Sequence, residues 1–165
     1  MSGVARFMHV SPGRFRQDWQ DAMPGEAVPA LPPLPRRATA GSAGYDFFAP
    51  AAFHLERGES IRVPTGVRAR IADGWVLMLF PRSGLGFRYR LQLDNTVGIV
   101  DSDYFGARNE GHIFIKLTNA GSRPLSVAAG EAFAQGVLVP YGLAEDDDAA
   151  AERVGGFGST DGSRE

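Results

Sequence analysis

Glycine and proline interrupt this sequence so regularly that few windows remain in which a long helix could form. The 165 residues include 21 glycines and 11 prolines, and both residue types are poorly tolerated inside helices. Between them lie short apolar segments bounded by Gly, Asp, Asn and Pro, a pattern that predicts strands. We expect strands at 60–63, 67–71, 76–80, 87–93, 98–100, 112–118 and 132–139. The pattern favours an all-β fold, either a sandwich, a jelly roll or a barrel, and leaves the topology open.

Two segments near the N-terminus fall outside the strand pattern. Ser11 before Pro12 is a good N-cap and first helical residue, and Phe15 and Trp19 lie one turn apart on one helix face. A short structural helix is therefore expected. The following stretch, "MPGEAVPALPPLPRR" at 23–37, is proline-rich without a period, which predicts an extended loop lying on the domain. A ligand for a proline-reading module is the less favoured alternative.

Composition limits the class of partner. Seventeen Lys and Arg against nineteen Asp and Glu give a net charge of −2, so there is no broad basic field for nucleic acid or an acidic membrane, and we expect a small-molecule partner. The absence of cysteine excludes disulfides, thiolate zinc sites and cysteine nucleophiles. The sequence has no apolar run near 18 residues and no signal-peptide core, so we expect a cytoplasmic protein.

We divide the chain into three parts around a single domain. Residues 1–37 form an N-terminal strand or helix and a proline-rich insert packed on the domain, and residues 38–143 form the β core. Residues 144–165 form an acidic linker, "AEDDDAAAE", and a glycine-rich C-terminal arm.

Two stretches of the β core could contact phosphate or metal. "GSAGYDFFAP" places Asp46 after a glycine turn, where aspartate is more often a turn residue than a ligand. "PRSGLG" follows an apolar run, so Arg82, Ser83 and the N–H groups of a glycine turn around Gly84 emerge at a strand end. That geometry suits phosphate oxygens, and a plain surface turn is the alternative.

Two further core stretches carry a carboxylate and an amide in apolar settings. "LDNTVGIVDSDYFG" at 93–106 resembles a hairpin whose edges carry Asn95, Asp101, Asp103 and Tyr104. The apolar "GIV" before Asp101 would hold that carboxylate partly buried, where it could activate water as a general base, although aspartate also forms turns. In "GEAFAQGVLV", Gln135 is either a ligand or a core amide satisfied by backbone.

The tail "RVGGFGSTDG" offers a charge, a stacking ring and two hydroxyls among glycines whose N–H groups can approach an anion closely. These groups belong to Arg153, Phe157, Ser159 and Thr160. Because the segment follows an acidic linker, it is expected to act as an arm on a tether.

The five stretches, in this order, resemble the homotrimeric dUTP diphosphatases (dUTPases) over residues 38–160. The motifs are "GSAGYDF", "PRSGLG", "NTVGIVDSDYFG", "GEAFAQ" and "GGFGST". The resemblance implies a jelly-roll-like β sandwich that forms a homotrimer with a flexible C-terminal arm. It also implies active sites shared between subunits, each closed by an arm over dUTP.

The resemblance also assigns roles. Asp101 would be catalytic, activating the water that attacks the α-phosphorus of dUTP to give dUMP and pyrophosphate. Tyr104 would lie under the deoxyribose and exclude a 2′-OH, while Asn95 and the backbone at Gly98 would read uracil. Asp46 would order a water on Mg²⁺, which the triphosphate mainly holds. Ser83 and Gln135 would contact phosphate, with Arg82 beside them in charge compensation or trimer packing. Phe157 would stack on uracil, and Arg153, Ser159 and Thr160 would reach the terminal phosphate. Gly84 and Gly158 would also contact the substrate.

Some residues depart from the family pattern. The segment 1–37 is longer than the core family needs, "FGARNEGH" at 105–112 carries extra residues beside the site, and Arg153 lies four residues before Phe157, where many members have five. The related dCTP deaminases use a glutamate on the strand after the hairpin, where this chain has Lys116. A dCTP deaminase-like enzyme and a nucleotide-gated regulatory trimer are the alternative functions.

Overall fold

Strands make up most of the regular structure of the computed structural model, which describes residues 3–151 and residue 153. The elements in chain order are β1 (Ala5–His9), α1 (Pro12–Ala22), β2 (Arg36–Arg37), β3 (Tyr45–Phe48), β4 (Phe53–Leu55), β5 (Ser60–Pro64), β6 (Val67–Ile71), β7 (Trp75–Pro81), α2 (Ser83–Tyr89), β8 (Leu91–Leu93), β9 (Gly98–Val100), the 3₁₀-helix η1 (Ser102–Gly106), β10 (Phe114–Asn119), β11 (Leu125–Val127) and β12 (Ala132–Pro140). This mostly β composition confirms the expected fold class.

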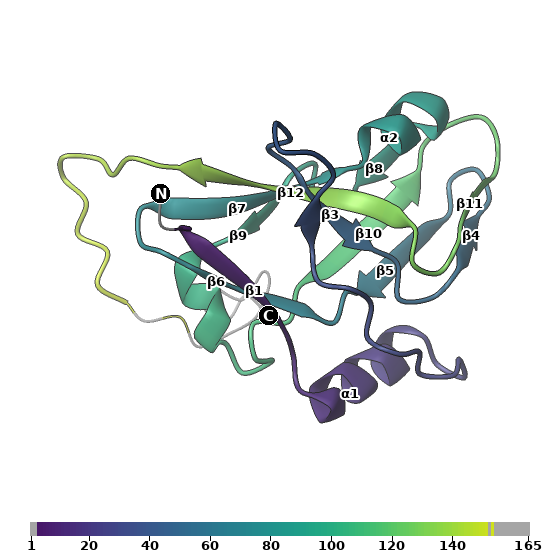
Figure 1. Cartoon of the computed structure of the whole chain (residues 1–165), viewed down its shortest axis with the longest axis horizontal. Helices are drawn as coiled ribbons and strands as arrows, with labels where there is room; N and C mark the ends of the chain where they lie inside the picture. Colours follow the sequence, from purple (N-terminus) through teal and green to yellow (C-terminus); the bar gives the residue numbers. More distant parts are fainter. Residues whose placement is uncertain (1–2, 152, 154–165) are drawn as a thin grey trace, which may run out of the picture.

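The strands pair antiparallel and form two main sheets (Figure 1). One sheet has the order β2-β3-β12-β7-β9 and the other β5-β10-β8, with β1-β6 and β11-β4 as two-stranded additions. The hairpin segments β8 and β9 therefore belong to different sheets, although only four residues separate them in the chain. Strand β7 lies between β12 and β9.

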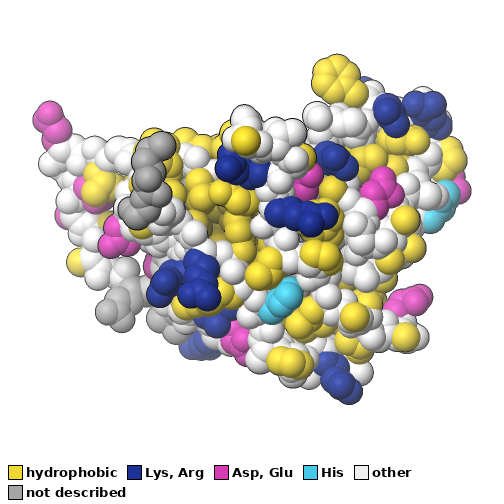
Figure 2. Space-filling view, in the orientation of Figure 1, with side chains coloured by type: hydrophobic (Ala, Val, Ile, Leu, Met, Phe, Trp, Pro, Cys, Tyr) yellow, Lys and Arg dark blue, Asp and Glu magenta, His cyan; other side chains and the backbone are white. Residues whose placement is uncertain are grey.

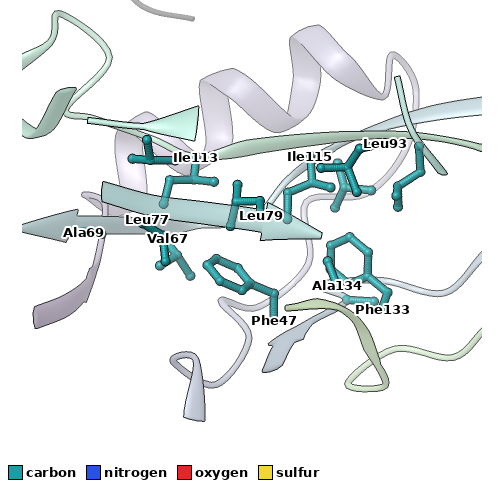
Figure 3. Packing of buried hydrophobic residues seen from close by; sticks show 14 of the residues in the cluster. Phe47, Val67, Ala69, Leu77, Leu79, Leu93, Ile113, Ile115, Phe133 and Ala134 are labelled. Carbon is teal, nitrogen blue, oxygen red and sulfur yellow. The ribbon is translucent and has the colours of Figure 1, made fainter. Parts of the chain in front are cut away.

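A continuous apolar core fills the space between the sheets (Figure 3). Most of its enclosed side chains come from the alternating inward positions of the strands, as the period of two requires, and Ile113 lies just before β10. They include Phe47, Val67, Leu77, Leu79, Ile113, Ile115, Leu117 and Phe133. On the face drawn in Figure 2, Lys and Arg side chains form small groups separated by apolar and neutral surface, in agreement with the nearly balanced charge.

Most of the predicted strands are confirmed, and one is wrong in part. The strands at 67–71 and 98–100 are found with the predicted bounds, but of 87–93 only 91–93 is a strand. Residues 83–89 form the helix α2, which Arg90 ends in a left-handed conformation at φ 51°. The alternation of Phe87 and Tyr89 with Arg88 and Arg90 imitates a strand, but the chain must turn here to enter β8.

The N-terminal segment packs on the β core through a second, smaller apolar cluster. Ser11 caps α1, as predicted, and its hydroxyl accepts a hydrogen bond from the Arg14 N–H at 3.2 Å. Phe15 and Trp19 are both buried, with ring centroids 5.9 Å apart. The strand β1 pairs with β6 along its whole length.

The proline-rich stretch is an extended segment held against the domain. Pro32 and Pro35 are buried, and the Pro32 carbonyl accepts a hydrogen bond from the His9 ring at 2.8 Å. These prolines are three residues apart, the spacing that places them on one face of a polyproline helix. These two prolines therefore face the domain, whereas Pro24 and Pro33 are exposed, and the alternative of a ligand for a proline-reading module stays untested.

Residues 144–151 of the predicted acidic linker are exposed and carry no helix or strand. The linker leads back toward η1 (Figure 1). Phe157, Gly158, Ser159 and Thr160 lie outside the described residues. Among the helices of the described ranges, none has both the length and the apolar character needed to cross a membrane.

Candidate active site

Asp101 stands where β9 ends and η1 begins. Gly98 and Val100 are buried against β7, with Val100 opposite Leu77 in the register. A Cβ at Gly98 would lie 2.9 Å from the Cβ of Leu79, so the close approach of β9 to β7 requires glycine there. Asp101 follows this anchored strand, and its side chain is 47% exposed. The carboxylate is thus fixed at its base and accessible to water, in line with the expected partial burial.

Arg153 lies on this carboxylate in the same chain. Its Nη2 is 2.6 Å from Oδ2 of Asp101, and its Nε is 2.8 Å from Oδ1 of Asp103. The Arg153 side chain is only 14% exposed, whereas the two carboxylates are about half exposed. The structure therefore places the beginning of the C-terminal arm directly over the predicted general base. The assignment of Arg153 to the terminal phosphate remains a prediction.

Tyr104 is buried, with Arg153 over its ring and two hydrogen bonds at its hydroxyl. Its residue surface is 2% exposed, and the Arg153 guanidinium carbon lies over the ring at 5.8 Å from the centroid. The hydroxyl donates to the His112 carbonyl at 2.6 Å and accepts from the Asn109 amide at 2.8 Å. Burial raises the pKa of the Tyr104 phenol above its ordinary value, so the hydroxyl stays protonated and acts as a donor.

A cavity of ≈ 210 Å³ opens beside Asn95 and Gly98, between the diverging hairpin strands and β10. Its inner walls are apolar and include Leu79, Leu93 and Ile115. A site with apolar walls and a few polar groups at its mouth has the general character of a base-binding pocket. The structure therefore brings the two residues predicted to read uracil together at one cavity.

Charged residues that the sequence analysis did not select also line this cavity. The Lys116 ammonium is 2.8 Å from Oδ2 of Asp94. The other carboxylate oxygen, Oδ1, accepts a hydrogen bond from the Thr118 hydroxyl. Hydrogen bonds from Lys116 and Thr118 lower the pKa of Asp94. The Arg62 guanidinium lies over the Phe114 ring at 4.2 Å. No sequence pattern links these residues, because they meet only through the pairing of β5, β8 and β10.

The residues predicted to contact phosphate and metal form a second group. Asp46 on β3 is the register partner of Gln135 on β12, and the Gln135 amide donates to the Pro81 carbonyl at 3.3 Å. Arg82 Nη2 lies 3.8 Å from Oδ2 of Asp46, whose side chain is 17% exposed. Asp46 lies in β3, after the predicted turn, and is not itself a turn residue.

Ser83 and Gly84 begin α2 beside this second group, so the groups expected in a glycine turn lie in a first helical turn instead. Together with Arg82 and Arg88 they line an open cavity of ≈ 360 Å³. Two guanidinium groups and the hydroxyl of Ser83 are therefore presented on one concave surface.

The two groups are well separated within one chain. Gln135 pairs with Phe80 on β7, whereas Val100, just before Asp101, pairs with Leu77. Three residues along β7 correspond to roughly 10 Å, and the three strand spacings from β3 to β9 add about 14 Å across the sheet. Asp46 and Asp101 of one chain therefore lie too far apart to contact the same phosphate group.

Comparison with known proteins identifies the origin of this arrangement. A family model for dUTPase matches residues 32–161. The chain belongs to the dUTPase family. A deoxyuridine 5′-triphosphate nucleotidohydrolase of Chromobacterium violaceum is 41% identical over 135 residues, which cover 77% of this chain and 87% of that protein. The predicted enzyme class, a dUTP nucleotidohydrolase, is confirmed.

Solved structures show the same fold. The dUTPase of Streptococcus mutans superimposes with a TM-score of 0.64 at 33% identity, covering 84% of this chain and 98% of that one. A D95N mutant dUTPase from phage phi11 of S. aureus, described with a structural Mg(II) ion, has a TM-score of 0.64 at 19% identity over 90% of this chain and 98% of its own. The jelly-roll-like β sandwich of the dUTPase type is therefore confirmed.

Proposed function

We propose that this chain hydrolyses dUTP to dUMP and pyrophosphate, with Asp101 as the general base. The observation that carries the proposal is the half-exposed carboxylate of Asp101, fixed at the end of β9, next to Tyr104 and near the cavity at Asn95 and Gly98. One chain segment thus carries, in order, the residues at the proposed uracil pocket, the proposed general base Asp101 and the ring proposed to lie under the deoxyribose.

In the proposed reaction, a water bound to Asp101 attacks the α-phosphorus of dUTP while the carboxylate takes its proton. The bond between the α-phosphorus and the bridging oxygen breaks, and pyrophosphate leaves. Tyr104 would support the deoxyribose, and Asn95 with the Gly98 backbone would hold uracil. These contacts would fix the α-phosphorus in line with the water, which lowers the entropic part of the barrier.

The phosphate-binding group would come from another subunit. Since Asp46 of one chain lies far from its own Asp101, the two carboxylates of a single chain cannot serve the same phosphate group. A homotrimer with three shared sites, as the family resemblance implies, resolves this separation. Each site would then combine the Asp101 segment of one subunit with the Asp46 group of a neighbour.

The residues present fit a Mg²⁺ ion that is held chiefly by the substrate. Mg²⁺ prefers oxygen ligands and commonly binds through one or two carboxylates, waters and substrate phosphates. Asp46 is a partly accessible carboxylate at the predicted phosphate surface, so it could hold a water of the ion. Bound there, Mg²⁺ would neutralise charge on the triphosphate.

Binding of the nucleotide would compete with the ion pairs of Arg153. The guanidinium covers both Asp101 and the ring of Tyr104, so a sugar resting on Tyr104 requires Arg153 to move. The triphosphate offers this arginine alternative anionic oxygens, which form strong charge-assisted hydrogen bonds with guanidinium groups. Arg153 would thereby exchange its ion pairs with Asp101 and Asp103 for contacts with the bound triphosphate.

The alternative functions have less support. A deaminase of the dCTP type would need a glutamate at the position of Lys116, and the ammonium of Lys116 is instead paired with Asp94. A nucleotide-gated regulatory trimer is compatible with the fold, but the retained, accessible Asp101 favours catalysis. The cytoplasmic location expected from the sequence remains a prediction.

The test is pyrophosphate release from dUTP, dCTP, dTTP and UTP with Mg²⁺, for wild type and for Asp101→Asn. Loss of a general base typically lowers the rate by roughly 10²–10⁴-fold, while binding of a non-hydrolysable dUTP analogue should persist. Asp103→Asn, the same change two residues away, keeps Asp101 and serves as the matched control. Near-normal turnover by Asp101→Asn would exclude it as the base.

A further inference from the structure

The helix α1 lies outside the residues that match the dUTPase family, yet it is bound to the loop that follows the catalytic segment. The family match begins at residue 32, whereas α1 spans Pro12–Ala22. At its N-terminus, the backbone N–H and the hydroxyl of Ser11 donate to the Glu110 carboxylate at 2.8 Å and 2.6 Å. These bonds lower the pKa of Glu110, which favours its charged form.

A second contact joins the middle of α1 to the end of the same loop. Nδ1 of His112 is 2.5 Å from Oδ2 of Asp18, and both residues are buried. The Gly66 N–H donates to the other ring nitrogen, Nε2, at 2.8 Å. Because Nε2 accepts, the proton of the neutral ring must be on Nδ1, which donates to Asp18. Arg14 pairs with the same carboxylate and completes its hydrogen bonds.

The loop between these two contacts holds the hydroxyl of Tyr104. The Tyr104 hydroxyl donates to the backbone carbonyl of His112, and the Asn109 amide donates to both oxygens, at 2.8 Å and 3.3 Å. The loop is also tightly packed against η1. Gly111 has φ +69°, and a Cβ there would lie 2.7 Å from the Tyr104 carbonyl oxygen. A shift of residues 109–112 would therefore be passed directly to Tyr104.

We propose that Asp18 and His112 are positioning residues for the dUTPase reaction, which set the Tyr104 ring through the His112 carbonyl. The Asp18 carboxylate on α1 orients the His112 ring, and the ring fixes the backbone at residue 112. The carbonyl of that residue in turn orients the Tyr104 hydroxyl, so α1 acts as a brace for the Tyr104 ring. The inference rests on the proposed role of Tyr104 beneath the deoxyribose. Its consequence is that discrimination between dUTP and UTP depends on a helix that does not touch the nucleotide.

The test is Asp18→Asn, with Asp21→Asn as the matched control on the same helix. Asp21 is exposed and accepts hydrogen bonds from Gln17, so the same chemical change there should leave the kinetics unaltered. We expect Asp18→Asn to lower kcat/KM for dUTP by roughly tenfold, since small misplacements can cost up to about a hundredfold. It should also reduce the preference for dUTP over UTP, measured well below the melting temperature.

A double-mutant cycle with Tyr104→Phe separates positioning from general destabilisation. Tyr104→Phe removes the hydroxyl through which the brace acts, so Asp18→Asn should then cost much less than in the wild type. The proposal would be overturned if Asp18→Asn lowered kcat/KM by the same factor with and without the Tyr104 hydroxyl. It would also be overturned if Asp18→Asn lowered the melting temperature but left the preference for dUTP over UTP unchanged.

If Asp18→Asn does not assemble, Glu110→Gln at the exposed contact takes its place in the same cycle, with the same expected direction. Absence of dUTP hydrolysis by the wild type would instead contradict the proposed function. The two failures are therefore distinguishable, because the positioning proposal is judged only against an active wild type.

Discussion

We predict that buried His112 makes the folded protein less stable in mild acid. The ring is fully buried, in contact distance of the Phe15 and Phe114 rings, and burial lowers its pKa. The charged groups that face it are Asp18 and Glu110, which favour protonation, and Arg14, which opposes it. Because Arg14 already pairs with Asp18, and the Gly66 N–H points at Nε2, a second ring proton has no acceptor.

The sign and the size of the effect follow from linkage. An unfolded histidine has a pKa near 6.5, about the value of the free side chain. Since the folded pKa is lower, the unfolded chain binds more protons between the two values, and stability falls as the pH falls. The contribution is fully present above about pH 7.5. At pH 5.5, one unit below the unfolded pKa, up to about 1.4 kcal/mol of unfolding free energy is lost.

The measurement is urea unfolding at pH 7.5 and pH 5.5, at one protein concentration, for wild type and His112→Gln. The glutamine can still accept from the Gly66 N–H but does not titrate, and the other two histidines are present in both proteins. The wild type should lose more unfolding free energy than the variant, by up to about 1.4 kcal/mol. If both proteins lost the same unfolding free energy between pH 7.5 and pH 5.5, a neutral buried His112 would be refuted. If the wild type instead became more stable relative to the variant at pH 5.5, the pairing with Asp18 would be shown to keep His112 charged.

Three further predictions concern the site. Tyr104→Ala should abolish the preference for dUTP over UTP and, because the residue is 2% exposed, cost about 3–5 kcal/mol of stability. The control Tyr104→Phe keeps the ring and should keep more of the preference. Equal ratios of kcat/KM for dUTP and UTP in the wild type and both variants would rule out sugar selection by the ring. Gly98→Ala brings a Cβ to 2.9 Å from Leu79, so it should cost about 1–3 kcal/mol and lower kcat/KM, whereas Gly142→Ala, which meets no atom within 4 Å, should change neither melting temperature nor rate. Deletion of 153–165 should leave a folded protein that keeps the wild-type oligomeric state in size-exclusion chromatography but has weak activity, and full kcat/KM in that protein would show that the arm is dispensable.

Local chemistry in the sequence determined the class of fold and the family. Turn residues around short apolar runs gave the strands at 67–71 and 98–100 with their bounds, and Ser11 before Pro12 gave the start of α1. These features depend on neighbours in the chain, through propensity, capping and the period of two. The five motifs identified the family for the same reason, since each motif is contiguous and their order is preserved.

Tertiary structure alone decided which residues meet. The pairing of Asp18 with His112 joins residues 94 apart, and that of Arg153 with Asp101 joins residues 52 apart. Residues 87–89 have a strand-like alternation but belong to the helix α2, which Arg90 ends before β8 begins. The separation of Asp46 from Asp101 follows from the strand order of one sheet. Such contacts depend on strand register and packing between distant segments, which no local pattern of residues specifies.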